Sequence, residues 1–205
     1  FSVTTDGSAP AELVLATDAD VTPTSFTPDG KTVLYTQFVA GRARVMVLPP
    51  AGPDGKREPH PLRQSSGSDF DAQVSPDGRY VALVSSESGE NQAYVLPFPG
   101  PGPKTQVSTE PTSRIRWAPS GRELFYFVGI AADARLTSVA TQLGPTFSAG
   151  PPRTLFQTFA GTTWGVAPDA EHFLIENVAR AEGGSVIATV TRWFGELRAR
   201  APAKR

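Results

Sequence analysis

The sequence has no cysteine and only two histidines. The missing cysteine excludes disulfides, thiolate metal ligands and cysteine nucleophiles, but it does not indicate a compartment, because many secreted proteins also lack disulfides. The histidines, His60 and His172, show no HExxH or other ligand spacing, so no zinc site is expected. A basic surplus is also missing, since the net charge is −1, and this argues against binding nucleic acid through phosphate contacts.

Long hydrophobic runs are missing as well. No stretch of about 18 apolar residues occurs, so no membrane span is predicted in this segment. The first residue is Phe1, without a signal-peptide pattern, so we expect any signal or anchor to lie upstream. The chain is still 39% hydrophobic, enough for a buried core, and its 19 glycines and 20 prolines are typical of short strands joined by many turns.

A turn motif recurs along the chain. Four segments resemble Ser-Pro-Asp-Gly, and their prolines are 43 to 49 residues apart: residues 25–30, 74–78, 117–121 and 166–170. In such a turn proline presets φ, aspartate bonds the local backbone, and glycine takes the left-handed conformation that closes a bulged hairpin. Ala170 replaces the glycine in the last copy, so that turn is predicted to be either mildly strained or different.

Each turn is followed by strand-like runs rich in β-branched and aromatic residues. The run directly after each turn covers 32–35, 80–84, 123–127 and 172–175; the next covers 43–48, 92–96, 136–140 and 186–190; a weaker last one covers 60–62, 104–107 and 153–156. Four antiparallel strands in about 45 residues are typical of a propeller blade. The sequence therefore predicts an all-β fold, a β-propeller of four-stranded antiparallel blades with about four blades visible, and an incomplete ring.

The repeat suggests blade boundaries. Residues 20–67, 68–110, 111–158 and 159–193 are predicted as four blades, and 194–205 as a basic tail with a short terminal helix. Residues 1–19 are predicted as the second half of a truncated blade, with strands at 1–4 and 12–15. The last unit lacks a clear fourth strand.

The segment 74–82 resembles the repeats of the TolB-like propeller family, in which Ser-Pro-Asp-Gly precedes a basic residue and a hydrophobic strand. Segments 87–100, 121–126, 144–147, 152–156 and 190–197 resemble more narrowly the C-terminal propeller region of bacterial eukaryotic-like serine/threonine protein kinases. The resemblance covers nearly the whole chain, most firmly from residue 69. The kinase motifs themselves are absent: no Gly-rich loop before a strand lysine, no His-Arg-Asp and no Asp-Phe-Gly.

This resemblance implies a non-catalytic binding or sensor module. It would present loops to a protein or small ligand, as the C-terminal part of a larger bacterial protein such as a receptor-type kinase, and an extracytoplasmic location is favoured by the resemblance alone. The alternative is the accessory propeller of a prolyl-oligopeptidase-like hydrolase whose catalytic domain is absent here. A third possibility is assembly through exposed sheet edges. No catalytic, cofactor or metal residue is predicted, and no nucleic acid partner.

Several residues were candidates for chemistry, and each has a structural interpretation that we favour. No Gly-x-Ser-x-Gly elbow is present, so Ser65, Ser66, Gly67 and Ser68 are interpreted as a loop. His60 lies in an outer strand or loop, and His172 follows a turn beside Glu171; both are interpreted as surface or half-buried histidines rather than members of a triad.

Acidic and proline-rich segments complete the candidates. The pairs Asp18, Asp20 and Asp69, Asp71 lie at blade entries, where acids can bind calcium, but hydrogen bonding to loop backbone is the preferred interpretation. Asp71 and Arg114 are placed near a ligand mouth without being assigned to it. The proline-rich stretch 97–103 is interpreted as a connector between strands rather than a docking motif.

Overall fold

The computed structural model describes residues 10, 12–129, 133–158, 164–177 and 186–190. In this part the chain forms four consecutive antiparallel sheets and no α-helix, which confirms the predicted all-β fold of four-stranded sheets. No helix there is long and apolar enough to cross a bilayer.

The first two sheets each have four strands in sequence order, and the third has a fifth strand. The first contains β1 (Asp20–Phe26), β2 (Val33–Val39), β3 (Arg42–Leu48) and β4 (His60–Pro61). The second contains β5 (Asp69–Val74), β6 (Tyr80–Ser85), β7 (Gln92–Pro97) and β8 (Thr105–Gln106). The third contains β9 (Thr112–Trp117), β10 (Glu123–Val128), β11 (Arg135–Leu143) and β13 (Arg153–Gln157), and β12 (Phe147–Ala149) pairs with the far end of β11.

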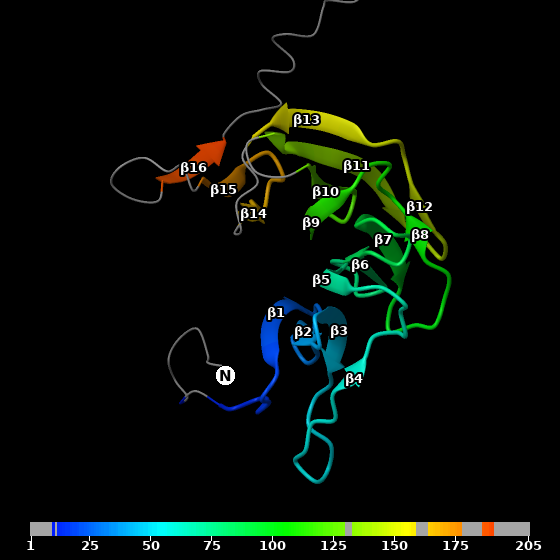
Figure 1. The fold of residues 1–205 in the computed structure, drawn as a ribbon, viewed down its shortest axis with the longest axis vertical. Coiled ribbons are helices and arrows are strands. Elements are labelled where there is room, and N and C mark those ends of the chain that lie inside the picture. Colours follow the sequence, from blue (N-terminus) through cyan, green and yellow to red (C-terminus); the bar gives the residue numbers. More distant parts are fainter. Residues whose placement is uncertain (1–9, 11, 130–132, 159–163, 178–185, 191–205) are drawn as a thin grey trace, which may run out of the picture.

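The fourth sheet contains β14 (Trp164–Val166), β15 (Phe173–Asn177) and β16 (Val186–Val190). Figure 1 shows the sheets following one another along an arc, with β1, β5, β9 and β14 on its inner side and β4, β8 and β13 on its outer side. This is the radial arrangement of propeller blades.

Two predictions near the chain ends have different outcomes. Residues 12–15 were predicted as an outer strand, but this was wrong: only Glu12 has a bridge, and Val14 and Leu15 instead line a groove beside the first sheet. The predicted strand 1–4 and the tail 194–205 lie outside the described residues.

Neighbouring sheets pack through alternate residues of their strands. We call the side of a sheet that is turned toward the sheet before it in the chain its preceding face, and the opposite side its following face. On the second sheet the preceding face carries Val81 and Leu83, which pack on Leu34 of the first sheet, and the following face carries Ala82 and Val84, which pack on the third. Because side chains alternate between the faces of a strand, the second sheet buries both of its faces.

The same alternation continues into the third and fourth sheets. Leu124 and Tyr126 belong to the core shared with the second sheet, whereas Phe125 and Phe127 belong to the core shared with the fourth. The ring centroids of Phe125 and Phe173 are 5.0 Å apart at an interplanar angle of 83°, an edge-to-face contact between the third and fourth sheets. The cores on both sides of the third sheet are rich in aromatic side chains.

The repeated turns have the conformation expected for Pro-Asp-Gly. The N–H of Gly30 donates to the Thr27 carbonyl at 2.8 Å, and the N–H of Ala170 donates to the Ala167 carbonyl at 2.9 Å. Ala170 adopts φ 57°, close to the 71° of Gly30, so the last turn keeps its shape and a side chain occupies the left-handed region. Of the two predicted alternatives, the strained one is correct.

Ala170→Gly is therefore expected to raise the free energy of unfolding by about 1 kcal/mol, because a left-handed conformation costs an alanine about that much more than a glycine. Gly30→Ala is the matched control, since an added Cβ would meet nothing within 4 Å there, and it should lower stability by a similar amount. Urea denaturation of both variants measures this. Equal midpoints for Ala170→Gly and the wild type would contradict the strain.

Tyr126 makes the stability sensitive to alkaline pH. Its side chain is fully buried in β10, and this burial, together with the negative charge of Glu110, raises the pKa of Tyr126 to about 12. The unfolded chain ionises this phenol near pH 10, whereas the folded chain does not, so stability is complete below pH 10 and is lost as the pH rises toward 12.

The expected loss between pH 10 and 12 is about 2–3 kcal/mol. Tyr126→Phe should flatten this part of the pH dependence, and should cost about 1 kcal/mol at neutral pH because the hydroxyl donates to the Val107 carbonyl. Urea midpoints across this pH range give the result. Tyr35, whose pKa burial also raises, leaves a smaller residual slope in the variant; an unchanged slope would contradict the assignment to Tyr126.

Candidate functional site

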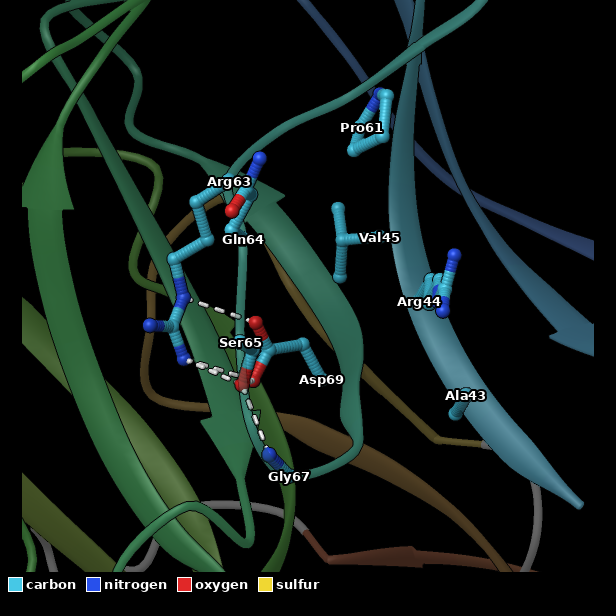
Figure 2. A pocket seen from close by; sticks show the side chains of 9 residues that line it. All are labelled: Ala43, Arg44, Val45, Pro61, Arg63, Gln64, Ser65, Gly67 and Asp69. Carbon is cyan, nitrogen blue, oxygen red and sulfur yellow. Dashed lines mark hydrogen bonds and ion pairs between the residues drawn. The ribbon is translucent and has the colours of Figure 1, made fainter.

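A pocket of about 290 Å³ lies where the first sheet is followed by the second (Figure 2). It is enclosed by β3, by β4 and by the loop that leads into β5. Its lining residues are Ala43, Arg44, Val45, Pro61, Arg63, Gln64, Ser65, Gly67 and Asp69.

One end of the pocket is a fixed polar group built on Arg63. The guanidinium pairs with Asp69 through Nε and Nη2, each 2.8 Å from a carboxylate oxygen. Nη2 also donates to Ser65 Oγ at 3.2 Å, and Ser65 Oγ in turn accepts from the Gly67 N–H at 3.2 Å (Figure 2). Because Asp69 is only 3% exposed, the two-point contact with Arg63 compensates a carboxylate that is almost completely removed from water.

Arg63 also connects this loop to the second sheet. It donates to Ser85 Oγ at 3.1 Å and to Glu87 Oε2 at 3.0 Å, and Lys104 pairs with the same carboxylate. Burial opposes the charged guanidinium, but the hydrogen bonds and charges of Asp69 and Glu87 outweigh it and raise the pKa of Arg63. Hydrogen bonds from Lys104 and from Arg63 lower the pKa of Glu87.

Small residues let the serine-rich loop pack against the second sheet. A Cβ on Gly67 would lie 2.5 Å from the Glu87 nitrogen and 2.7 Å from the Ser86 carbonyl carbon, so no side chain fits there. Ser68 and Ser86 join the loop to the end of β6, because the Ser68 N–H donates to Ser86 Oγ at 2.9 Å. The loop thus has a packing role, and neither histidine is among the residues that line its pocket.

The opposite wall is apolar and its rim is basic. Ala43 and Val45 are buried on β3, Pro61 lies above them, and Arg44 is exposed at the rim (Figure 2). The ionised residues of the lining are two arginines and one aspartate. A fixed polar end, an apolar wall and a net positive lining suit a small group that carries an acidic function.

Asp71 lies on the inner strand β5 and is fully engaged. Its carboxylate accepts the Ile115 N–H at 2.8 Å and pairs with Arg116 Nη1 at 2.9 Å, both on β9 of the next sheet. Asp71 is a non-glycine residue with φ 50° at a register shift of β5, and it is 6% exposed. Arg114 lies half-buried on the same β9, but the partner of Asp71 is Arg116.

Further side chains join the inner strands to one another. Gln73 Nε2 donates to the Thr24 backbone carbonyl of β1 at 2.7 Å. The backbone carbonyl of Gln73 accepts from Trp117 Nε1 of β9 at 3.0 Å. The Arg116 guanidinium lies 5.5 Å from the ring centre of Trp164 on β14. The inner strands of all four sheets are therefore linked by side chains.

The contacts of the two histidines in the described part of the chain are local. His60 is exposed, and its Nδ1 lies 3.5 Å from the Glu58 carbonyl. His172 Nδ1 lies 2.5 Å from Asp169 Oδ2 in the turn before β15, and hydrogen bonds from the Glu171 backbone and from His172 help to lower the pKa of Asp169. Neither imidazole has a hydrogen bond to a serine or threonine among the described residues.

The two acidic pairs differ in their exposure to solvent. Asp18 and Asp20 are exposed, whereas Asp69 and Asp71 are buried and each pairs with an arginine. In the described ranges no three His, Cys, Asp or Glu residues come together as a metal site would require. Asp71 binds the backbone of strand β9 rather than a loop, and Asp69 binds the Arg63 side chain, so their bonds differ from the predicted hydrogen bonding to loop backbone.

The proline-rich stretch connects β7 to β8, as predicted. Pro99, Pro101 and Lys104 line a shallow groove of about 500 Å³ on the outer side. Sequence reasoning did not single out Arg44, Arg63 or Arg116. A lone arginine in a loop or strand carries no signal of its own, because its partner is assigned only when two distant segments meet.

Comparison with known proteins was made at the level of sequence and of structure. No protein-family model and no curated protein matches the sequence. Among solved structures, a putative TolB from Agrobacterium tumefaciens is 19% identical, with a TM-score of 0.57 over 68% of this chain and 50% of that one. An oligogalacturonate lyase in complex with manganese is 13% identical, with a TM-score of 0.61 over 88% of this chain and 53% of that one.

A puromycin hydrolase is 18% identical, with a TM-score of 0.56 over 86% of this chain and 28% of that one. The chain thus spans about half the length of the first two structures. The similar proteins include enzymes as well as TolB, so the fold alone does not assign an activity. At these identities the likeness establishes the architecture, and the chain has the β-propeller fold of TolB-like proteins.

Proposed function

We propose that this chain is a non-catalytic binding module and that the pocket of Figure 2 accepts an acidic side chain of a partner protein. The observation that carries the proposal is the Arg63–Asp69 pair, which holds a polar end in place beside the apolar wall of Val45 and the basic rim of Arg44. Such a preformed site costs little ordering when it is filled.

The surroundings of the candidate catalytic groups support a binding role over chemistry. Asp69 and Asp71 are neutralised by arginines, and two serine hydroxyls have structural bonds: Ser65 Oγ accepts from the Gly67 N–H, and Ser68 Oγ accepts from the Ala43 N–H of β3. The linked inner strands provide the rigid scaffold on which propellers present recognition loops.

Selection of a random peptide library displayed on phage tests the proposal directly. The immobilised chain is expected to enrich peptides that contain Asp or Glu. Binding of these peptides to the Arg44→Glu variant should weaken by about tenfold or more, because the rim charge is reversed. Arg122→Glu, which changes an exposed arginine in the turn directly before β10, is the matched control and should bind as the wild type does. Peptides that bind both variants equally would contradict the proposed pocket.

We further propose that the module is the C-terminal part of a larger bacterial protein, such as a receptor-type serine/threonine kinase. Support comes from the sequence resemblance of segments such as 121–126 and 190–197 to the propeller regions of those kinases. The complete open reading frame tests this: an upstream kinase domain is expected, and an adjoining hydrolase domain would favour the alternative of an accessory propeller.

A further inference from the structure

The pocket of Figure 2 lies against the edge of β3 that is turned away from β2. Four backbone groups of Ala43 and Val45 point to this edge, and two of them have partners. The Ala43 N–H donates to Ser68 Oγ at 3.2 Å, and the Val45 C=O accepts from the Leu62 N–H at 2.9 Å. The Ala43 C=O and the Val45 N–H have no partner among the described residues, although the two residues are only 7% and 3% exposed.

The second sheet shows what occupies the corresponding N–H group elsewhere in the repeat. Counted from the repeated turn through the strand registers, Ala93 of β7 holds the position of Val45, and its N–H donates to Ser108 Oγ at 2.9 Å. Arg63 holds the position of Ser108, because each directly follows the residue whose N–H donates to the C=O of Val45 or Ala93. A guanidinium has no acceptor, and that of Arg63 is turned to Asp69. Arginine in place of serine therefore leaves the Val45 N–H open to the pocket.

The C=O group of Ala43 also differs from its counterparts. Asn91 in the second sheet and Ala134 in the third hold the same position relative to the turn and the register. The Asn91 C=O accepts from the Thr112 N–H, and the Ala134 C=O accepts from the Thr158 N–H, both at 2.8 Å. Of these three sheets, the first is the one whose C=O at this position has no partner in the described ranges.

The two free groups specify the direction of a strand that could add to this edge. An antiparallel strand bonds the N–H and the C=O of the same residue, and in both Ala43 and Val45 one of these groups is already taken. A parallel strand bonds the C=O of one residue and the N–H of the residue two positions later, and a single residue of the added strand makes both bonds. The Ala43 C=O and the Val45 N–H have this spacing, with Arg44 between them. The open edge therefore fits one residue of a parallel segment.

We propose, on the basis of the function proposed above, that the acidic residue of the partner enters the pocket within an extended segment parallel to β3. Its own N–H donates to the Ala43 C=O, and its own C=O accepts from the Val45 N–H. Because paired residues of neighbouring strands direct their side chains to the same face, its carboxylate lies beside Arg44. The lining, with two arginines and one aspartate, favours an acid there. Main-chain bonds of this kind supply affinity, and the side chain supplies specificity.

N-methylated peptides test the pairing without altering the protein. The probe is an acidic peptide from the phage selection whose binding Arg44→Glu weakens, synthesised with an N-methyl group on its acidic residue. It is expected to bind about tenfold more weakly or worse, because the donor to the Ala43 C=O is lost. N-methylation of the next residue is the matched control. The N–H of that residue points away from β3, so the dissociation constant from calorimetry should change by less than about twofold.

Hydrogen exchange of the Val45 amide tests the second bond. In the chain saturated with the unmodified peptide this amide should exchange about tenfold more slowly or less than in the free chain. The Ala93 amide, which already donates to Ser108, is the control and should change little. A peptide that depends on Arg44 but tolerates N-methylation of its acidic residue, or leaves exchange of Val45 unchanged, would overturn the pairing and leave the acidic pocket in place. If no acidic peptide binds, both proposals are wrong.

Discussion

Arg63→Leu is expected to lower the free energy of unfolding by about 3–5 kcal/mol, which is the range for removing one partner of a buried ion pair. The variant leaves the Asp69 carboxylate 3% exposed without its two-point contact to Arg63. It also removes donors to Ser85 and Glu87, which join the loop of residues 61–69 to the second sheet. Urea denaturation gives the change, with the m value reporting whether the loop detaches early.

The control for this prediction is Arg44→Leu, which changes the same residue type at the exposed rim of the same pocket and should shift stability by less than about 0.5 kcal/mol. The double variant Arg63→Leu with Asp69→Leu should recover much of the loss, because both charges leave the interior together. If Arg63→Leu and Arg44→Leu cost the same, the pair does not stabilise the fold in the manner described.

Asp71→Ala is expected to cost about 3 kcal/mol or more. It removes the acceptor of the buried Ile115 N–H and the partner of Arg116, so two donors of β9 lose their bond across the interface. Asp71→Asn keeps an oxygen for Ile115 and tolerates φ 50°, so it should lose about half as much. Asp71→Gly should be less harmful than Asp71→Ala by about 1 kcal/mol, because glycine accepts a positive φ.

Hydrogen exchange of the Ile115 amide distinguishes loss of its hydrogen bond to Asp71 from a general loss of stability. In Asp71→Ala the amide should exchange much faster than those of its strand neighbours, whereas in Asp71→Asn it should remain protected. Protection of Ile115 that is unchanged in Asp71→Ala would show that the carboxylate does not hold β9. The loss of stability should decrease in the order Asp71→Ala, Asp71→Gly, Asp71→Asn. The place of glycine in this order follows from the positive φ of residue 71.

The turns and the strands directly after them were predictable because their causes are local. Glycine or its substitute closes each hairpin at a fixed place, and hydrophobic runs follow it, so strands such as β6 and β10 were located closely. The inner strands were not located, because a strand such as β9 mixes Thr112 and Arg116 with buried Trp117 and shows no clear period. Its polar residues find partners on other sheets, which local sequence does not reveal.

By itself the sequence determined the repeat, its turn chemistry, and the alternation that gives each sheet two apolar faces, because these depend on residues within a few positions of one another. Only the tertiary structure decided that Arg63 pairs with Asp69 and that Asp71 reaches Arg116 across 45 residues. These depend on the position of one blade against the next, and that position results from packing energies summed over a whole interface rather than from any single residue.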